Sequence, residues 1–526
     1  MTGLARIILA LLLGASPAAA QQVTVDSGTI AGTTIAGGVK AWMGVPFAAP
    51  PVRELRWKPP QPAARWAGTR AATMAAPMCP QPGRGRTMNH YFGNEAVSED
   101  CLYLNVWTPP GSPPAGKAWP VVVWIYGGAF NVGSTSMANY SGAELAKKGV
   151  VQVNIAYRVG PLGFLAHPEL TREGGGHSGN YGLMDQIAGL EWVKRNIAAF
   201  GGDPGNVTIA GQSAGSMSVA MLQISPLAKG LFHRVVGMSG SPWRPRGGVG
   251  LAEAEQQGLN VQKALGAANI EAMRDLPSDR ILAGSASVQR DATIIDGRVI
   301  TGDAAATFAA GGQSKVPLLI GFTRDEGNAN LGTITSKAEY EAAVRARFGA
   351  QADAVLAGYA PASDADLTRA TNDLQRDMSL GQQVMRWATA QAKSGAPAYV
   401  WLFARRQPYA DGISFADHDA ATAGAYHTGD VPYWFQTLDS LNLFRTTRNW
   451  TAADRALGEQ MSDMLVRFAR GDAPDAAWPV FDPAKPKLMW LDLQSKPIDW
   501  PRAALVNALN PTPAPLRAPQ ANRPRD

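Results

Sequence analysis

The sequence contains few cysteines, few histidines and a modest share of charged residues. Among 526 residues there are two cysteines and six histidines, and 17% of the residues are charged. No Cys-x-x-Cys pair occurs, which argues against a redox dithiol and against a zinc ribbon. The H-E-x-x-H motif, the P-loop and the dinucleotide-binding fingerprint are missing as well. We therefore expect no metal and no other cofactor.

Long runs of Lys and Arg are also missing. The formal net charge is +6, but the densest basic stretches, Arg84 with Arg86 and Arg405 with Arg406, are short and separated. A nucleic-acid-binding protein gathers its cationic residues on one face or along one helix. The composition therefore predicts no nucleic-acid partner and leaves room only for some steering of anionic substrates.

One short apolar run lies at the N-terminus. Residues 7–13 are apolar, Arg6 precedes them, and the small residues 18–20 follow. This arrangement predicts a signal peptide over residues 1–20. The run is too short to cross a bilayer as a helix, and no other segment approaches ~18 consecutive apolar residues. We expect export to the periplasm or secretion, and no membrane span in the mature protein.

Export bears on the pairing of Cys79 and Cys101. An even number of cysteines in an exported chain predicts a disulfide, and the alternative is two separate thiols. The bond would close a loop of roughly 20 residues and contribute about 3 kcal/mol to stability in the chain-entropy description.

Short apolar runs rich in β-branched residues alternate with longer helical patterns along most of the chain. Such runs predict the buried strands of a mostly parallel sheet flanked by helices, which is an α/β fold. The Ala-rich regions 251–282 and 337–393 are expected to be helical insertions or lids. We expect one domain over residues 21–509 and a disordered, Pro-rich tail over residues 510–526. The expected strands are 121–125, 150–157, 207–210, 235–238, 316–322 and 399–403, and the expected crossover helices are 185–200 and 214–224.

The first motif with chemical meaning is Gly211-Gln212-Ser213-Ala214-Gly215. It follows an expected strand and precedes an expected helix, which is the context of a nucleophile elbow. The glycines permit a sharp turn that exposes Ser213, and the positive end of the helix lies beneath the reacting centre. The alternative is a plain tight turn.

A serine nucleophile needs a base, and the base needs an acid that orients it. In this architecture both residues follow the serine in the chain. Of the two late histidines, His418 lies between aspartates in what we interpret as a solvated loop, whereas His427 lies in a glycine-bounded loop. Glu326 and Asp325 both follow the expected strand 316–322. Spacing alone does not separate these two carboxylates.

Acyl transfer also needs hydrogen-bond donors for the oxyanion. Residues 126–130, with the sequence Tyr-Gly-Gly-Ala-Phe, follow an expected strand, and their glycines let backbone N–H groups approach a ligand. Together with the N–H of Ala214, this segment would supply three donors. The alternative is a simple glycine turn.

These motifs resemble those of the type-B carboxylesterases, the family that also contains cholinesterases and bacterial para-nitrobenzyl esterases. Residues 200–215 are similar to the family's serine motif over its full length, and residues 98–106 match its second motif. Residues 44–48 are also typical of the family. The resemblance extends from about residue 40 to about residue 435, and it implies an α/β-hydrolase fold with a central, mostly parallel sheet.

The resemblance also assigns roles at the matching positions. It implies that Ser213 is the nucleophile and His427 the base. It places the family's acid on Glu326 rather than on Asp325. The resemblance implies that the oxyanion donors are Gly128, Ala129 and Ala214, and that Cys79 and Cys101 form the family's first disulfide. It also implies that the hydroxyl of Ser239 lies beside the triad, and the alternative is an ordinary turn serine.

The sequence departs from the family pattern in places. Gln212 occupies a position where many members have Glu, which removes a charge beside the nucleophile. Asn328, Ala329 and Asn330 follow the acid, where cholinesterases have aromatic residues, and Tyr91 lies near the position expected for their choline-binding tryptophan. Recognition of choline by cation–π contacts is therefore poorly supported.

The sequence thus predicts a serine carboxylic-ester hydrolase that acts through an acyl-enzyme on Ser213. Its expected partner is a small-molecule ester, and its expected assembly is a monomer or a weak homo-oligomer. The alternatives are a non-catalytic binding protein on the same fold and a specialised hydrolase of a lactone, a carbamate or a toxin ester. Specificity lies in inserted loops, which the motifs do not describe.

Overall fold

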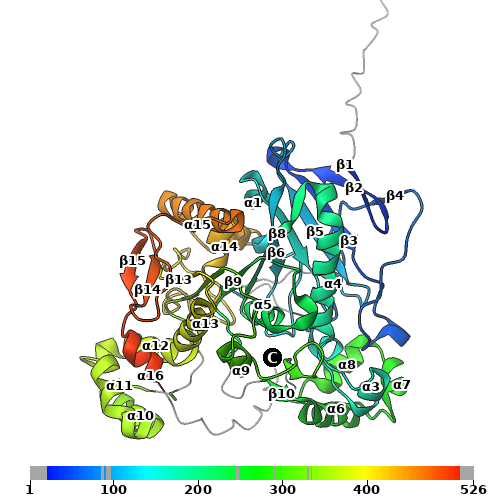
Figure 1. The fold of residues 1–526 in the computed structure, drawn as a ribbon. Helices are drawn as coiled ribbons and strands as arrows, with labels where there is room; N and C mark the ends of the chain where they lie inside the picture. Colours follow the sequence, from blue (N-terminus) through cyan, green and yellow to red (C-terminus); the bar gives the residue numbers. More distant parts are fainter. Residues whose placement is uncertain are drawn as a thin grey trace, which may run out of the picture.

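The computed structural model describes residues 21–83, 88–89, 96–243, 248–288, 292–327, 331–332 and 334–509. The predicted signal peptide, the predicted tail, Tyr91 and residues 328–330 lie outside the described residues. Most of the described chain is organised around a 13-stranded sheet that runs through the molecule (Figure 1).

The centre of this sheet is parallel, as the apolar runs predict. Its strands pair in the order β7-β6-β8-β9-β12-β13-β14, and every neighbouring pair among them is parallel. All residues of β6, β7, β12 and β13 are buried, because helices cover both faces of a parallel sheet. The bounds are β6 (Trp119–Ile125), β7 (Val151–Ile155), β8 (Gly202–Gln212), β9 (Arg234–Met238), β12 (Leu318–Thr323), β13 (Ala398–Phe403) and β14 (Lys487–Leu491).

Mostly antiparallel strands extend the sheet at both ends, and no apolar run in the sequence marks them. On one side the order is β1-β2-β3-β5, with β4 parallel to β2, and on the other side β15 pairs antiparallel with β14. Many of these strands are half-exposed, so they lack the continuous apolar run that marks a central strand. Their bounds are β1 (Gln21–Val25), β2 (Gly28–Thr34), β3 (Lys40–Pro46), β4 (Thr69–Ala71), β5 (Tyr103–Thr108) and β15 (Lys496–Asp499).

The helices confirm the expected crossovers and the expected helical insertions. Helix α5 (Ala214–Ile224) packs against β8 and β9, and α15 (Ala452–Arg470) packs against β6 and β8. The inserted helices gather at two lower corners of the molecule, α6 to α8 at one and α10 with α11 at the other (Figure 1). The remaining bounds are α1 (Ala143–Lys147), α2 (Gly160–Gly163), α3 (Pro168–Glu173), α4 (Tyr181–Asn196), α6 (Leu251–Leu265), α7 (Ile270–Arg274), α8 (Ser278–Ser285), α9 (Ala304–Ala309), α10 (Lys337–Phe348), α11 (Ala352–Tyr359), α12 (Leu367–Arg376), α13 (Gln382–Lys393), α14 (Val431–Trp434) and α16 (Ala503–Ala508).

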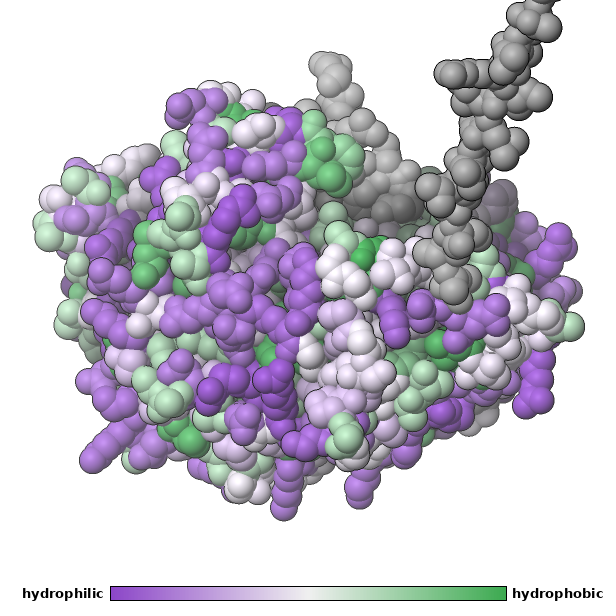
Figure 2. Space-filling view, turned by 90° about the horizontal axis from the view of Figure 1, so that it is seen from above, coloured by the Kyte–Doolittle hydropathy of each residue, from purple (hydrophilic) through white to green (hydrophobic). Residues whose placement is uncertain are grey.

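The surface seen from above is mostly hydrophilic where it is coloured, with hydrophobic side chains scattered in small groups (Figure 2). In the described part of the chain, no helix combines the length and the apolarity that a bilayer crossing requires.

Candidate active site

The sharp turn between β8 and α5 presents Ser213. Its backbone lies at φ 57° and ψ −121°, a conformation that L-residues adopt only under constraint. The turn is held because the N–H of Ser213 donates to the carbonyl oxygen of Met238, at 2.8 Å, on the neighbouring strand β9. This strained strand-to-helix turn is the geometry of a nucleophile elbow.

The flanking glycines are required by close backbone contacts. A Cβ atom on Gly211 would lie 2.4 Å from the carbonyl carbon of Gly215, and one on Gly215 would lie 2.1 Å from the carbonyl oxygen of Ile125. Real Cβ atoms do not approach this closely, so any other residue would push β8, α5 and β6 apart. The glycine spacing of the motif therefore follows from packing around Ser213.

Glu326, in the loop after β12, is the carboxylate that contacts a histidine. Its side chain is 1% exposed and one oxygen accepts hydrogen bonds from the N–H of Thr323, at 2.6 Å, and from the hydroxyl of Ser239, at 2.7 Å. The other oxygen pairs with Nδ1 of His427. The hydroxyl predicted beside the triad, that of Ser239, thus fixes one oxygen of Glu326 and leaves the other for the imidazole.

The far side of the imidazole faces the nucleophile elbow. Nε2 of His427 lies 3.1 Å from Nε2 of Gln212, the residue before Ser213. Among the described residues, the Ser213 hydroxyl makes no hydrogen bond to this ring. The structure thus brings His427 close to Glu326 and to Gln212 of the elbow. The Gln212 amide occupies the side of Nε2 at which a proton from Ser213 would arrive. Its position next to Ser213 was the only sequence signal for this contact.

Two carboxylates raise the pKa of His427 by more than desolvation lowers it. Desolvation lowers the pKa of His427, but Glu326 and then Asp430 raise it, and the result is a pKa above the ordinary 6.5. The side chain retains 44% of its exposure, so the ring is both surrounded by charge and reachable by a ligand. An imidazole in this setting can accept a proton on Nε2 while Nδ1 remains directed at Glu326.

Asp430 is a buried carboxyl that the sequence analysis missed. It is fully buried, and one oxygen lies 3.4 Å and 3.3 Å from the indole nitrogens of Trp401 and Trp434, while the other finds no partner in the described residues. Burial and then the charge of Glu326 raise the pKa of Asp430 to about 6. Its position three residues after His427 was the only sequence signal.

The predicted oxyanion segment lies against the elbow. A Cβ atom on Gly127 would lie 3.0 Å from Cβ of Ser213, so the two backbones are in contact. Gly128 and Ala129 have positive φ values of 113° and 54°. Among the described residues, the N–H groups of Gly128, Ala129 and Ala214 have no hydrogen-bond acceptor, so these donors could serve a ligand.

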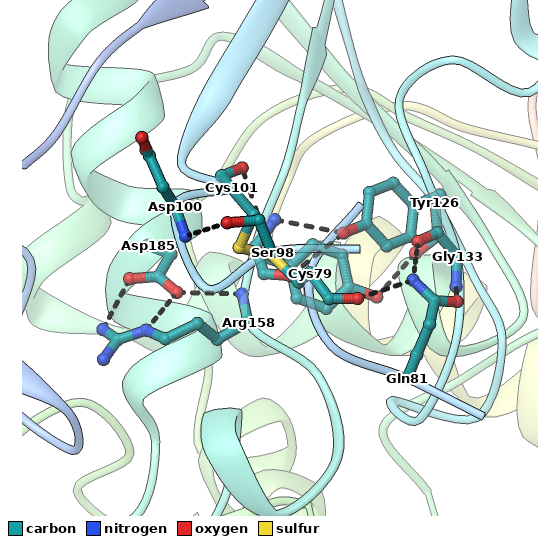
Figure 3. The surroundings of a disulfide bond; sticks show 10 residues. Cys79, Gln81, Ser98, Asp100, Cys101, Tyr126, Gly133, Arg158 and Asp185 are labelled. Atoms are coloured by element: carbon teal, nitrogen blue, oxygen red, sulfur yellow. Dashed lines mark hydrogen bonds and ion pairs between the residues drawn. A yellow bond between two sulfur atoms is a disulfide. The ribbon is translucent and has the colours of Figure 1, made fainter. Parts of the chain in front are cut away.

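The predicted disulfide is present close to this segment. Cys79 and Cys101 are bonded, with their Cα atoms 5.0 Å apart. Gln81 lies between the disulfide and Gly133 (Figure 3), and its amide donates to the carbonyl oxygen of Gly133, at 2.8 Å, and accepts from the N–H of the same residue, at 2.8 Å. The disulfide segment thus supports the end of the predicted oxyanion segment.

The other late histidine, His418, is half-buried rather than solvated. Its Nε2 lies 2.6 Å from the hydroxyl of Tyr409, and its ring packs against Tyr426. The neighbouring Asp417 and Asp419 are exposed, as a solvated loop predicts, whereas the ring of His418 packs onto the segment that carries His427. Within the described residues, no group of three His, Cys, Asp or Glu side chains could hold a metal ion.

Known proteins share both the sequence and the fold. The model of the Carboxylesterase family matches residues 19–507. A Fumonisin B1 esterase from Sphingopyxis macrogoltabida is 37% identical over 477 residues, which is 87% of this chain and 84% of that protein. A Para-nitrobenzyl esterase from Bacillus subtilis (strain 168) is 31% identical over 499 residues, which is 90% of this chain and 95% of that protein.

Solved structures of a PNB esterase share the architecture. One covers 94% of this chain and all of its own, at 30% identity and a TM-score of 0.77. A second covers 92% of this chain and 98% of its own, at 30% identity and a TM-score of 0.73. The fold is therefore the predicted α/β-hydrolase fold, and the named relatives over nearly the whole chain are esterases. These similarities account for a site in which a serine in a strained elbow lies near an imidazole and a buried glutamate. The chain belongs to the carboxylesterase family and is a carboxylic-ester hydrolase.

Proposed function

We propose that the enzyme cleaves esters by two-step acyl transfer through Ser213. The observation that carries the proposal is the pairing of Nδ1 of His427 with buried Glu326 while Nε2 faces the elbow. This pairing fixes the tautomer in which Nε2 is free to accept a proton. It also places the positive charge that develops on the imidazole next to a carboxylate.

In the first step, the Ser213 hydroxyl replaces the Gln212 amide as the partner of Nε2. The hydroxyl proton moves to Nε2 as the serine oxygen attacks the ester carbonyl carbon and forms a tetrahedral oxyanion. The amides of Gly128, Ala129 and Ala214 donate to this oxyanion. The imidazolium then returns the proton to the alkoxide leaving group, and the carbon–oxygen bond of the ester breaks.

In the second step, water takes the place of the departed alcohol. Nε2 of His427 removes a proton from the water, which attacks the acyl-enzyme and forms a second oxyanion at the same donors. Collapse of this intermediate releases the carboxylic acid and restores the Ser213 hydroxyl. Glu326 holds the Nδ1 side of the ring throughout and so orients it.

The substrate is proposed to be an ester with an apolar portion. A small pocket lies along α5, beginning one helical turn after Ser213, and apolar side chains make up much of its wall. The similarity to a protein named Fumonisin B1 esterase favours a specialised ester over a general one. The residues of the pocket are Met217, Met221, Pro242, Gly248, Thr293, Ile295, Ile300, Gly302 and Ala304.

Export is proposed on independent grounds. The chain holds a disulfide at Cys79 and Cys101, and such bonds persist in oxidising compartments. Together with the signal peptide predicted over residues 1–20, this supports a periplasmic or secreted enzyme. Expression with and without residues 1–20, followed by fractionation and mass measurement of the mature N-terminus, tests the proposal.

The mechanism is tested by the substitution Ser213→Ala. Hydrolysis of para-nitrophenyl acetate and butyrate should fall by several orders of magnitude, because the acyl-enzyme can no longer form. Circular dichroism and thermal melting should show that the fold survives. Retention of full activity in this variant would reject Ser213 as the nucleophile. A separate panel of esters that differ in acyl length and charge, tested on the native enzyme, would define the substrate class.

A further inference from the structure

Asp325, the carboxylate that spacing could not separate from Glu326, bonds to the loop that carries His427. Its Oδ2 accepts a hydrogen bond from the N–H of Ala425 at 2.7 Å, and its own N–H donates to the carbonyl oxygen of Ala425 at 3.0 Å. The residue before the acid is thus joined by two hydrogen bonds to the residue two positions before the base. The two neighbouring carboxylates hold different parts of the same unit, one the ring and one the backbone.

Gly424 shows how closely this carboxylate packs on the loop. Its φ is 59°, and a Cβ atom there would lie 2.1 Å from Oδ2 and 2.4 Å from Cγ of Asp325. A side chain at this position would displace the carboxylate from the N–H that it accepts. The glycine that begins the His427 loop therefore makes room for Asp325.

The opposite side of the loop is held by Gln407. Its amide nitrogen donates to the carbonyl oxygen of Gly429 at 2.9 Å, and its oxygen accepts from the hydroxyl of Tyr426 at 2.9 Å. Between these two anchored sides, Thr428 adopts a φ of 74°, which is unusual for a β-branched residue. Such a conformation persists only where the surroundings impose it, so the loop around His427 has little freedom.

The charge of Asp325 is balanced locally and is not directed at the imidazole. Nη2 of Arg324 lies 2.9 Å from Oδ2 of Asp325, and Nε of Arg324 lies 3.1 Å from the same oxygen. The carboxylates that act on the charge of His427 are Glu326 and Asp430. The contribution of Asp325 to the site is therefore one of geometry, through an oxygen that accepts a backbone N–H.

We propose that Asp325 is a positioning residue, whose carboxylate oxygen docks the loop of residues 424–429 so that His427 meets Glu326 and the elbow. This proposal rests on the proposed function, because it assumes that His427 is the base. It predicts that an oxygen acceptor at position 325 is required and that a negative charge there is not. A misplacement of the base by ~1 Å costs on the order of 100-fold in rate.

The experiment compares Asp325→Ala with Asp325→Asn in the full-length enzyme. Each variant is titrated with a fluorophosphonate to the end point, so that kcat is expressed per reactive serine. We expect kcat of Asp325→Ala to fall roughly 10- to 100-fold with a smaller change in KM, because only the transition state needs the exact position of the base. Asp325→Asn keeps an acceptor oxygen and should recover to within about threefold of the native enzyme.

The pH dependence separates positioning from electrostatics. The acid limb of kcat/KM should lie at the same pH in the native enzyme and in both variants, because Asp325 does not set the pKa of His427. A matched control is Asp482→Ala, which removes a carboxylate that accepts from the N–H of Ala484, at 2.8 Å, in an exposed turn. This control should leave kcat unchanged. If Asp325→Ala does not fold, the variant Gly424→Ala takes its place. It displaces the same carboxylate from the side of the loop and should lower kcat in the same range.

Three results would overturn the proposal: native kcat per reactive serine in Asp325→Ala, no recovery in Asp325→Asn, or a shifted acid limb in either variant. Where Asp325→Ala does not fold, native kcat in Gly424→Ala would do the same. Failure of the proposed function looks different, since Ser213→Ala would then retain activity. An inactive Ser213→Ala beside a fully active Asp325→Ala would remove only the positioning role.

Discussion

Two loops carry the groups of the proposed mechanism, and they are held in different ways. The oxyanion loop, residues 126–133, is supported by a disulfide segment through Gln81. At its other end Tyr126 stacks on Tyr157 at 4.4 Å, and each hydroxyl donates to the other residue's carbonyl oxygen, at 3.0 and 2.8 Å. The base loop, residues 424–430, is held by hydrogen bonds and lies among carboxylates.

The difference matches what each loop has to do. Oxyanion donors act by being fixed before the charge develops, so a covalent and aromatic support suits them. In the proposed mechanism the base changes its charge in every cycle, and the carboxylates near His427, Glu326 and Asp430, would stabilise the imidazolium. Loss of a carboxylate that faces the imidazole should therefore alter rate and pH dependence, whereas damage to the oxyanion loop should alter stability and rate without moving the pH profile.

The largest effect is expected from Glu326→Gln, which acts on the base loop. The amide cannot stabilise the imidazolium, and its N–H₂ group favours the tautomer with the wrong nitrogen protonated. We expect kcat to fall about 10³- to 10⁴-fold at neutral pH, with the fold retained. Steady-state kinetics with para-nitrophenyl esters measure this. A loss of less than about tenfold would contradict the role of Glu326.

The next effect is expected from replacing both cysteines, Cys79→Ser with Cys101→Ser, which acts beneath the oxyanion loop. The free energy of unfolding should fall by about 2–4 kcal/mol, because the unfolded chain gains freedom when the loop is no longer closed. Denaturant titration of the oxidised native enzyme and the double variant measures the change. Equal stability of the two proteins would show that the disulfide contributes nothing to this region.

A smaller effect is expected from Gln81→Ala. The N–H and the carbonyl of Gly133 would lose their partner, and each lost hydrogen bond lowers stability by about 0.5–1.5 kcal/mol. We expect a lower melting temperature and a reduced kcat, while the acid limb of kcat/KM stays where it is in the native enzyme. A shift of that limb would show that the two loops do not divide their roles as described.

The smallest effect on rate is expected from Asp430→Asn, which tests whether the charge of this carboxylate acts on His427 in the base loop. The pKa of Asp430 is about 6, so its carboxyl is mostly ionised above that pH and helps to raise the pKa of His427. Without this charge the pKa of His427 falls, and the acid limb of kcat/KM should move to lower pH with a nearly native plateau. An unmoved limb would mean that Asp430 does not act on the base.

The sequence carried the elements that depend on local pattern. The buried parallel strands are continuous apolar runs, and the elbow is marked by Gly211 and Gly215, which backbone contacts require. The half-exposed antiparallel strands at the sheet ends gave no such signal. The alternation along β2, for example, includes Gly28 and Gly32, which propensity alone does not assign to a strand.

The parts of the site that could not be predicted depend on which loops meet. Asp325 and Glu326 are adjacent in sequence, and only the docking of a loop about 100 residues away sends one to a backbone N–H and the other to an imidazole. The contact of Gln212 with His427 and the burial of Asp430 between two indole rings arise in the same way. Spacing describes neither, because tertiary packing decides which groups share a space.

The central claim is that His427, oriented by Glu326, activates the hydroxyl of Ser213. The most direct test is the rate of covalent labelling by a fluorophosphonate, with the modified residue identified by peptide mass spectrometry, in the native enzyme and in His427→Ala. We predict a single label on Ser213 and a labelling rate at least ~100-fold lower without the imidazole. A label on another residue, or an equal rate in both proteins, would contradict the claim.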